Sequence, residues 1–266
     1  MPHVSFKKDP KDLFHFFDDV TTVLLTGLKR TTSPTLAEKL NSDFHVVCLL
    51  NALFGNPNIH LVQKHPGFKG LVNYPQAKEK QANYSDGFNL VNEKKRKNAL
   101  TEVLRFILQH ESKVHEAGKD VYKVALDHLM NGAVRPAVNW LNQHGKTQMA
   151  THVINCFGNE LQKRALEGWL VNESRRAQIK EGTGAETMLR FMTCTLLQKE
   201  HEYSWMQALC YQLMVVSSNT DTLVDVIKKF DAYMAQKHQG DRQPLLWLLI
   251  KFYGVDDPEA LKKTLK

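Results

Sequence analysis

The feature that constrains this chain most is the repetition of helix start and stop signals along its length. An Asp-Pro or Ser-Pro pair supplies a helix cap followed by a proline in the first turn, and such pairs occur at Asp9-Pro10, Ser33-Pro34 and Asp257-Pro258. Asn-Gly turns between alternating apolar and polar residues, which would signal β-hairpins, are missing, and runs of Val, Ile and Thr are few. The sequence therefore predicts an all-α protein.

Apolar periodicity and these signals together predict about ten helices. After the helix that opens at Pro34, we expect a separate helix that starts at Ser42 and stops at Gly55. Further on, four glycines at nearly regular spacing each mark the end of a helix: Gly118, Gly132, Gly145 and Gly158. The segments between them are about three helical turns long, and two of these segments share a pattern of apolar residues. Two architectures stay open, an irregular multi-helix bundle and a short α-superhelix.

The domain organisation is suggested by a stretch rich in proline and glycine. Residues 66–86 are expected to form an exposed loop or linker, with one helical turn just before it, near residues 59–64. This loop would separate an N-terminal helical segment, residues 1–65, from a larger helical body, residues 87–266. One continuous domain is the alternative.

Charge and cysteine content indicate the compartment and the partners. The 266 residues carry a formal net charge of +7, which suits an acidic protein face or nucleic acid. The four cysteines are far apart and lie among apolar residues, so we expect reduced, buried thiols in a cytoplasmic protein. We expect no secretion signal and no membrane-spanning segment, since no apolar run is long enough to cross a bilayer, although peripheral membrane contact stays open.

The densest basic run comprises Lys94, Lys95, Arg96 and Lys97. An apolar helical stripe begins directly after it, so the helix either starts near Asn98 or extends outward past the body of the protein. In both cases the basic residues would gather at a helix N-terminal end, outside the packed core, where positive charge is unfavourable without an anion. The run is therefore a candidate site for an anion or acidic partner, or a nuclear-import signal, and the alternative is a solvated turn.

Other basic residues are weaker candidates, because they occur mostly in pairs on polar helix faces near acidic residues. They would contribute to binding only if the fold brings them beside the first run. These candidates are Lys163, Arg164, Arg175, Arg176 and Lys180.

Motifs for catalysis or for cofactor and metal binding are weak. The histidines lack the spacing of three or four that places two metal ligands on one helical face, and no Gly-x-Ser-x-Gly motif is present. The segment from Lys180 to Gly184 places glycines before a helix, but the strand that phosphate-binding loops require does not precede it. We expect no metal, no cofactor and no enzymatic activity.

These features favour a soluble, non-enzymatic interaction or adaptor protein that presents helical surfaces to another protein, which we expect to have an acidic face. The alternative is a basic helical nucleoprotein that binds phosphates through residues 94–97. The third hypothesis is an enzyme whose active site has no recognisable motif.

Overall fold

The computed structural model describes residues 10–68, 87–111, 114, 118–157, 183–194, 196, 203–218, 220–237 and 244–254. These residues form ten α-helices and no strand, which confirms the expected all-α fold and fits a multi-helix bundle. Two compact units make up the chain. The first comprises Met1–Val103, Thr222–Asp231 and Gly240–Lys266, and the second comprises Leu104–Asp221 and Ala232–Gln239. Apart from residues 66–68, the expected linker at 66–86 lies outside the described residues.

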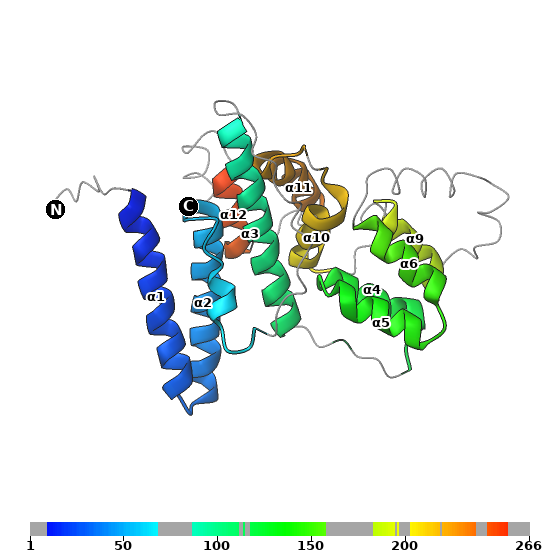
Figure 1. Ribbon diagram of the computed structural model, residues 1–266, viewed down its shortest axis with the longest axis horizontal. Helices are drawn as coiled ribbons and strands as arrows, with labels where there is room; N and C mark the ends of the chain where they lie inside the picture. Colours follow the sequence, from blue (N-terminus) through cyan, green and yellow to red (C-terminus); the bar gives the residue numbers. More distant parts are fainter. Residues whose placement is uncertain are drawn as a thin grey trace. The chain divides into compact units, whose positions relative to one another are not determined.

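The first unit begins with the antiparallel helices α1 (Pro10–Arg30) and α2 (Pro34–Phe54), which lie side by side in Figure 1. Ser33 caps α2 as predicted, because its side-chain oxygen accepts a hydrogen bond from the main-chain N–H of Leu36 at 3.4 Å. A Cβ atom on Gly27 would lie only 3.2 Å from the Leu40 side chain, so this glycine permits a close approach of the two helices.

We predicted a separate helix from Ser42 to Gly55. The predicted start is wrong and the predicted end is confirmed. Helix α2 runs without interruption from Pro34 to Phe54 and stops before Gly55. Serine and aspartate favour helix starts but do not enforce them, since they leave every main-chain N–H available. Ser42 and Asp43 are exposed within α2, where polar side chains are tolerated.

Two further elements and parts of two others complete the first unit. The predicted turn before the loop is the short 3-10 helix η1 (Leu61–Lys64), and α3 (Gly87–Glu111) and α11 (Leu223–Lys237) each run from this unit into the second. Helix α12 (Leu245–Gly254) packs against α2. Its Trp247 is fully buried, with its ring 5.2 Å from that of Phe230 in an edge-to-face arrangement.

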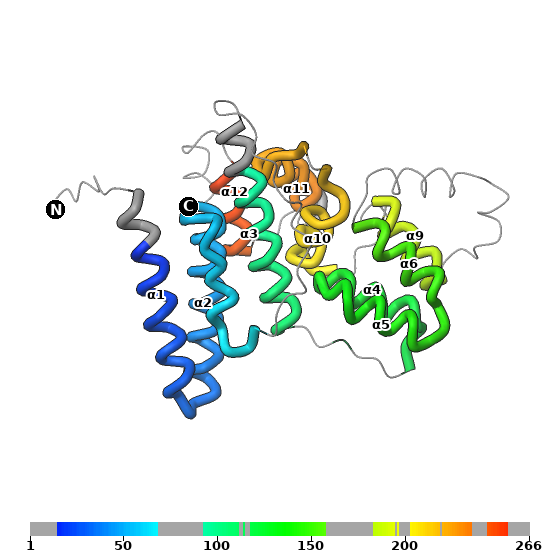
Figure 2. Tube along the Cα trace, viewed as in Figure 1, coloured from blue at the N-terminus to red at the C-terminus, as the bar shows by residue number. Residues whose placement is uncertain are grey.

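The second unit contains α4 (Val121–Met130), α5 (Val134–Gln143) and α6 (Thr147–Cys156), which follow one another as short consecutive rods in Figure 2. The glycine stops between them are confirmed. Gly132 and Gly145 have φ angles of +69° and +71°, the left-handed conformation that glycine adopts at little cost. The stop expected at Gly158 lies outside the described residues.

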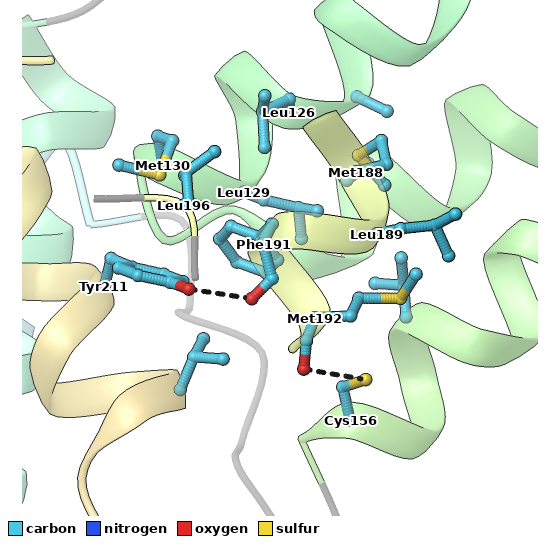
Figure 3. Packing of buried hydrophobic residues seen from close by; sticks show 14 of the residues in the cluster. Leu126, Leu129, Met130, Cys156, Met188, Leu189, Phe191, Met192, Leu196 and Tyr211 are labelled. Atoms are coloured by element: carbon cyan, nitrogen blue, oxygen red, sulfur yellow. Dashed lines mark hydrogen bonds between the residues drawn. The ribbon is translucent and has the colours of Figure 1, made fainter. Parts of the chain in front are cut away.

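The core of the second unit forms where α4, α5 and α6 meet α9 (Gly184–Met192), α10 (Trp205–Tyr211) and the π-helical segment η3 (Gln212–Val216). As Figure 3 shows, leucine and methionine side chains surround Phe191, and the Tyr211 hydroxyl donates a hydrogen bond to the Phe191 main-chain oxygen at 2.9 Å. This bond satisfies the one polar group of a buried tyrosine. Ser204 caps α10, and Gln207 completes a capping box with it.

Candidate functional site

The basic run lies inside α3 rather than at its start. The helix begins at Gly87, so Lys94 follows about two turns later. The expectation that the run gathers at a helix N-terminal end is therefore wrong. Asn98 is a reasonable cap in isolation, but the seven residues before Lys94 include no proline, and nothing in their chemistry ends a helix there.

Arg96 closes the C-terminal end of α2. Its guanidinium Nη1 donates to the main-chain oxygens of Leu53 at 2.7 Å, Gly55 at 3.1 Å and Ala52 at 3.4 Å. The last carbonyl groups of a helix have no donor within the helix, and the helix dipole places partial negative charge there. A cation with several N–H donors satisfies both requirements, so Arg96 has a structural role in the first unit.

A second contact joins the same part of α3 to α12. The Tyr253 hydroxyl donates a hydrogen bond to the Glu93 carboxylate, and the Arg96 guanidinium lies 6.0 Å from the centre of the Tyr253 ring. Burial raises the pKa of Tyr253 well above its ordinary range, and the neighbouring Glu93 carboxylate raises it further. Phe54, at the end of α2, contacts the same aromatic group, with ring centres 6.0 Å from Phe252 and 5.7 Å from Tyr253.

The four residues of the run differ in their surroundings. Lys97 is buried with 9% exposure, and Arg96 bonds to α2, so the expectation that all four residues lie outside the core is wrong for these two. They follow Glu93 by three and four residues, which places them on the helical face that carries the Tyr253 contact. Lys94 and Lys95 are half-buried. Their binding of an anion stays a prediction.

The weaker basic candidates Lys163, Arg164, Arg175, Arg176 and Lys180 all lie outside the described residues. The structure does describe the helix start that follows Lys180. Thr183 caps α9, and a Cβ atom on Gly184 would lie 2.2 Å from the carboxylate of Asp120, which itself caps α4. A carboxylate so close to this helix start would repel a phosphate, so the arrangement does not support a phosphate site.

Sequence reasoning missed a polar cluster around Glu102. This carboxylate accepts hydrogen bonds from the His60 ring and, at 3.0 Å, from the Gln63 amide. The bond to Glu102 raises the pKa of His60, while burial opposes the shift. His60 and Glu102 are 42 residues apart and form no motif, so no local signal could have identified the pair.

A small cavity of about 10 Å³ adjoins this cluster, enough for one water molecule. Cys48, His60 and Glu102 all line it, a combination that resembles the components of a thiol-based active site. Burial raises the pKa of the Cys48 thiol far above its ordinary value, and the negative charge of Glu102 makes a smaller contribution in the same direction. The thiol therefore stays protonated and is a poor nucleophile. The cluster connects η1 to α3 and does not support catalysis.

Two helices of the first unit carry large apolar side chains on their outer faces. On α12, Leu245 is 67% exposed and Phe252 is 46% exposed, and the half-buried Leu248 and Leu249 lie between them. On α1, Phe16 and Val23 are exposed. A spacing of seven residues places each exposed pair on one face of its helix, opposite the buried side. These faces are the candidate interaction surfaces.

In the part of the chain that the structure describes, no helix is long and apolar enough to cross a membrane, and no three His, Cys, Asp or Glu side chains gather as metal ligands. Comparisons of the sequence with models of known families and with curated proteins find no match.

Proposed function

We propose that this protein is a non-enzymatic interaction protein whose docking surface for another protein is the outer face of α12. The observation that carries the proposal is the exposure of Leu245 and Phe252 on one face, with Leu248 and Leu249 between them. Helices of soluble proteins usually turn polar residues to the outside, and a contiguous exposed apolar strip marks a binding surface.

The rigid attachment of α12 supports the same proposal. Trp247 anchors its inner side in the core, and a Cβ atom on Gly254 would lie 2.6 Å from Ile227, so helix α12 approaches α11 closely. Tyr253 ties its end to α3 through Glu93. A strip held in this way loses little conformational freedom when it binds, which favours affinity.

The partner that fits is an amphipathic helix with an apolar face and acidic residues at its edges. The apolar face would cover the strip, as in other complexes in which a helix lies in a hydrophobic groove. Acidic edges suit the net charge of +7 and the partly exposed Lys94 and Lys95 of the same unit. We place the protein in the cytoplasm, with nuclear import through the run at 94–97 as the alternative.

Nucleic-acid binding through the basic run has less support. Arg96 already donates to three main-chain oxygens and Lys97 is buried, which leaves Lys94 and Lys95 as the accessible cations of the run. Two lysines would neutralise few phosphates, and nucleic-acid affinity depends on the number neutralised.

Affinity capture from the native source, followed by mass spectrometry, tests the proposal. The bait is the full chain, either wild type or with Leu245→Gln and Phe252→Gln, and a matched control carries Ile154→Gln, which replaces an apolar residue of 55% exposure in the second unit. We expect proteins that bind the wild type and the control to be lost with the α12 variant, while the helical circular dichroism stays unchanged. Equal capture by all three baits would overturn the proposal. Co-purification of nucleic acid that depends on Lys94 and Lys95 would favour the alternative.

A further inference from the structure

The outer face of α1 has a heptad pattern that the fold leaves uncovered. Five residues spaced alternately by three and four positions lie on one side of the helix, and all five are exposed: Phe16, Asp19, Val23, Thr26 and Arg30. This is the spacing of the seam along which two helices of a coiled coil meet. The opposite side of α1 is buried, with Phe17, Thr21 and Leu25 each less than 9% exposed.

The middle of this seam is more apolar than its residue types suggest. Val23 is 70% exposed, and the Thr26 hydroxyl donates to the main-chain oxygen of Thr22 within its own helix at 2.7 Å. A threonine whose hydroxyl is bonded in this way presents mainly its methyl group to a neighbour. The seam therefore has an apolar centre, with an acidic residue, Asp19, towards one end and a basic residue, Arg30, at the other.

We infer that a second copy of this chain binds along this seam, with the two α1 helices antiparallel. In that orientation Asp19 of each copy faces Arg30 of the other, and Val23 faces Thr26. The pairing follows from the sequence positions, because 19 with 30 and 23 with 26 have the same sum, as a two-fold axis requires. The symmetric contact thus contains two Asp–Arg pairs, one on each side of an apolar centre.

Parallel pairing does not have this complementarity. It would place Asp19 beside Asp19 and Arg30 beside Arg30 of the second copy, and like charges that face each other are unfavourable. Other antiparallel registers of the seam bring Asp19 opposite Val23 or leave the charges without partners. Charge complementarity thus selects both the partner and its orientation. This surface is separate from the outer face of α12, so the inference does not depend on the function proposed above.

Charge reversal tests the inference, with sedimentation velocity on the full chain as the readout. Wild type is expected to shift from monomer to dimer as its concentration rises. Asp19→Arg and Arg30→Asp should each weaken dimerisation by about tenfold or more, because each turns two attractive pairs into repulsive ones. The double variant Asp19→Arg with Arg30→Asp should dimerise again, since the pairs are restored with their signs exchanged.

A mixture of the two single variants gives the sharpest result. One variant then carries arginine at both positions and the other aspartate, so the two should form a mixed dimer although neither dimerises well alone. Lys39→Asp is the matched control. It makes the same type of charge change, from a basic residue to aspartate, at an exposed position of α2 that is not part of α1, and should leave dimerisation unchanged.

Three outcomes would overturn the inference: a wild type that is monomeric at every concentration, a mixture that forms no dimer, or a Lys39→Asp effect equal to that of Arg30→Asp. Loss of capture by the α12 variant with a monomeric wild type would leave the proposed function standing and remove this inference alone.

Discussion

The guanidinium of Arg96 lies 2.7 Å from the main-chain oxygen of Leu53, at the end of α2. A basic residue from the run that looked most like a binding site is therefore part of the framework of the first unit. Hydrogen bonds from charged donors contribute more to stability than neutral ones, and removing the donor leaves partly buried carbonyl groups unsatisfied.

Arg96→Gln is accordingly expected to lower the free energy of unfolding by about 2–3 kcal/mol. Lys94→Gln and Lys95→Gln remove the same charge from half-buried positions and should stay within about 0.5 kcal/mol of wild type. Urea unfolding followed by circular dichroism measures all three. Replacing residues 94–97 together should also destabilise the protein, because Arg96 is among them. Equal stability of Arg96→Gln and Lys95→Gln would refute this account.

Gly132 and Gly145 offer a matched pair of substitutions. Both have positive φ angles, but a Cβ atom on Gly132 would lie 2.4 Å from Cγ of Arg105, whereas a Cβ on Gly145 has nothing within 4 Å. Gly145→Ala should cost about 1–2 kcal/mol from backbone strain, and Gly132→Ala about 1–3 kcal/mol more because the buried Arg105 must move. Thermal unfolding of the two variants provides the comparison, and similar costs would argue against the tight packing at Gly132.

Trp247 is fully buried, whereas Trp205 is half-buried. Trp247→Ala removes an entire core side chain and its edge contact with Phe230, so it should cost about 3–5 kcal/mol. Trp205→Ala should cost roughly half as much, since less apolar surface is buried there. Chemical unfolding distinguishes the two. A Trp247→Ala variant as stable as wild type would mean that α12 does not close the core of the first unit.

The His60–Glu102 pair predicts a pH dependence of stability. The hydrogen bond to Glu102 raises the folded-state pKa of His60 above its ordinary value of about 6.5. A raised folded-state pKa stabilises the protein fully below the unfolded-state pKa, and this stabilisation is lost as the pH rises through the folded-state value. The free energy of unfolding should therefore decline as the pH rises above about 6.5.

Unfolding curves measured across this pH range test the prediction. Glu102→Gln should reduce the decline, because the neutral amide no longer favours protonated His60. Asp18→Asn breaks the ion pair between Asp18 and Lys64, the last residue of η1, and should keep the decline. An unchanged pH profile in Glu102→Gln would show that another group causes the decline.

Thiol reactivity should differ among the cysteines. Cys48, Cys156 and Cys210 are buried, and burial raises the pKa of Cys210 to about 12, whereas Cys194 is half-buried with a φ angle of +62°. A thiol reagent should therefore modify Cys194 first in the native protein. The Cys194→Ser variant should lack this fast phase of the modification reaction. Peptide mass spectrometry identifies the modified residue. Rapid modification of Cys210 would contradict its burial.

Local chemistry accounts for the features that could be predicted from the sequence. A proline or a capping serine acts on the few residues beside it, so the helix starts at Pro10 and Pro34 could be located without knowing the fold. The stop at Gly132 has the same character, because a left-handed residue ends a helix wherever it occurs. The start expected at Ser42 was wrong because serine favours a cap without blocking helix continuation.

The candidate site depended on contacts between distant parts of the chain. Arg96 and Leu53 are 43 residues apart, and His60 and Glu102 are 42 residues apart. Neither pair forms a local sequence motif. A basic run has the same sequence whether its side chains face solvent or the end of another helix. Which of the two holds is set by how α2, α3 and α12 pack, because packing determines which carbonyl groups each cation can reach.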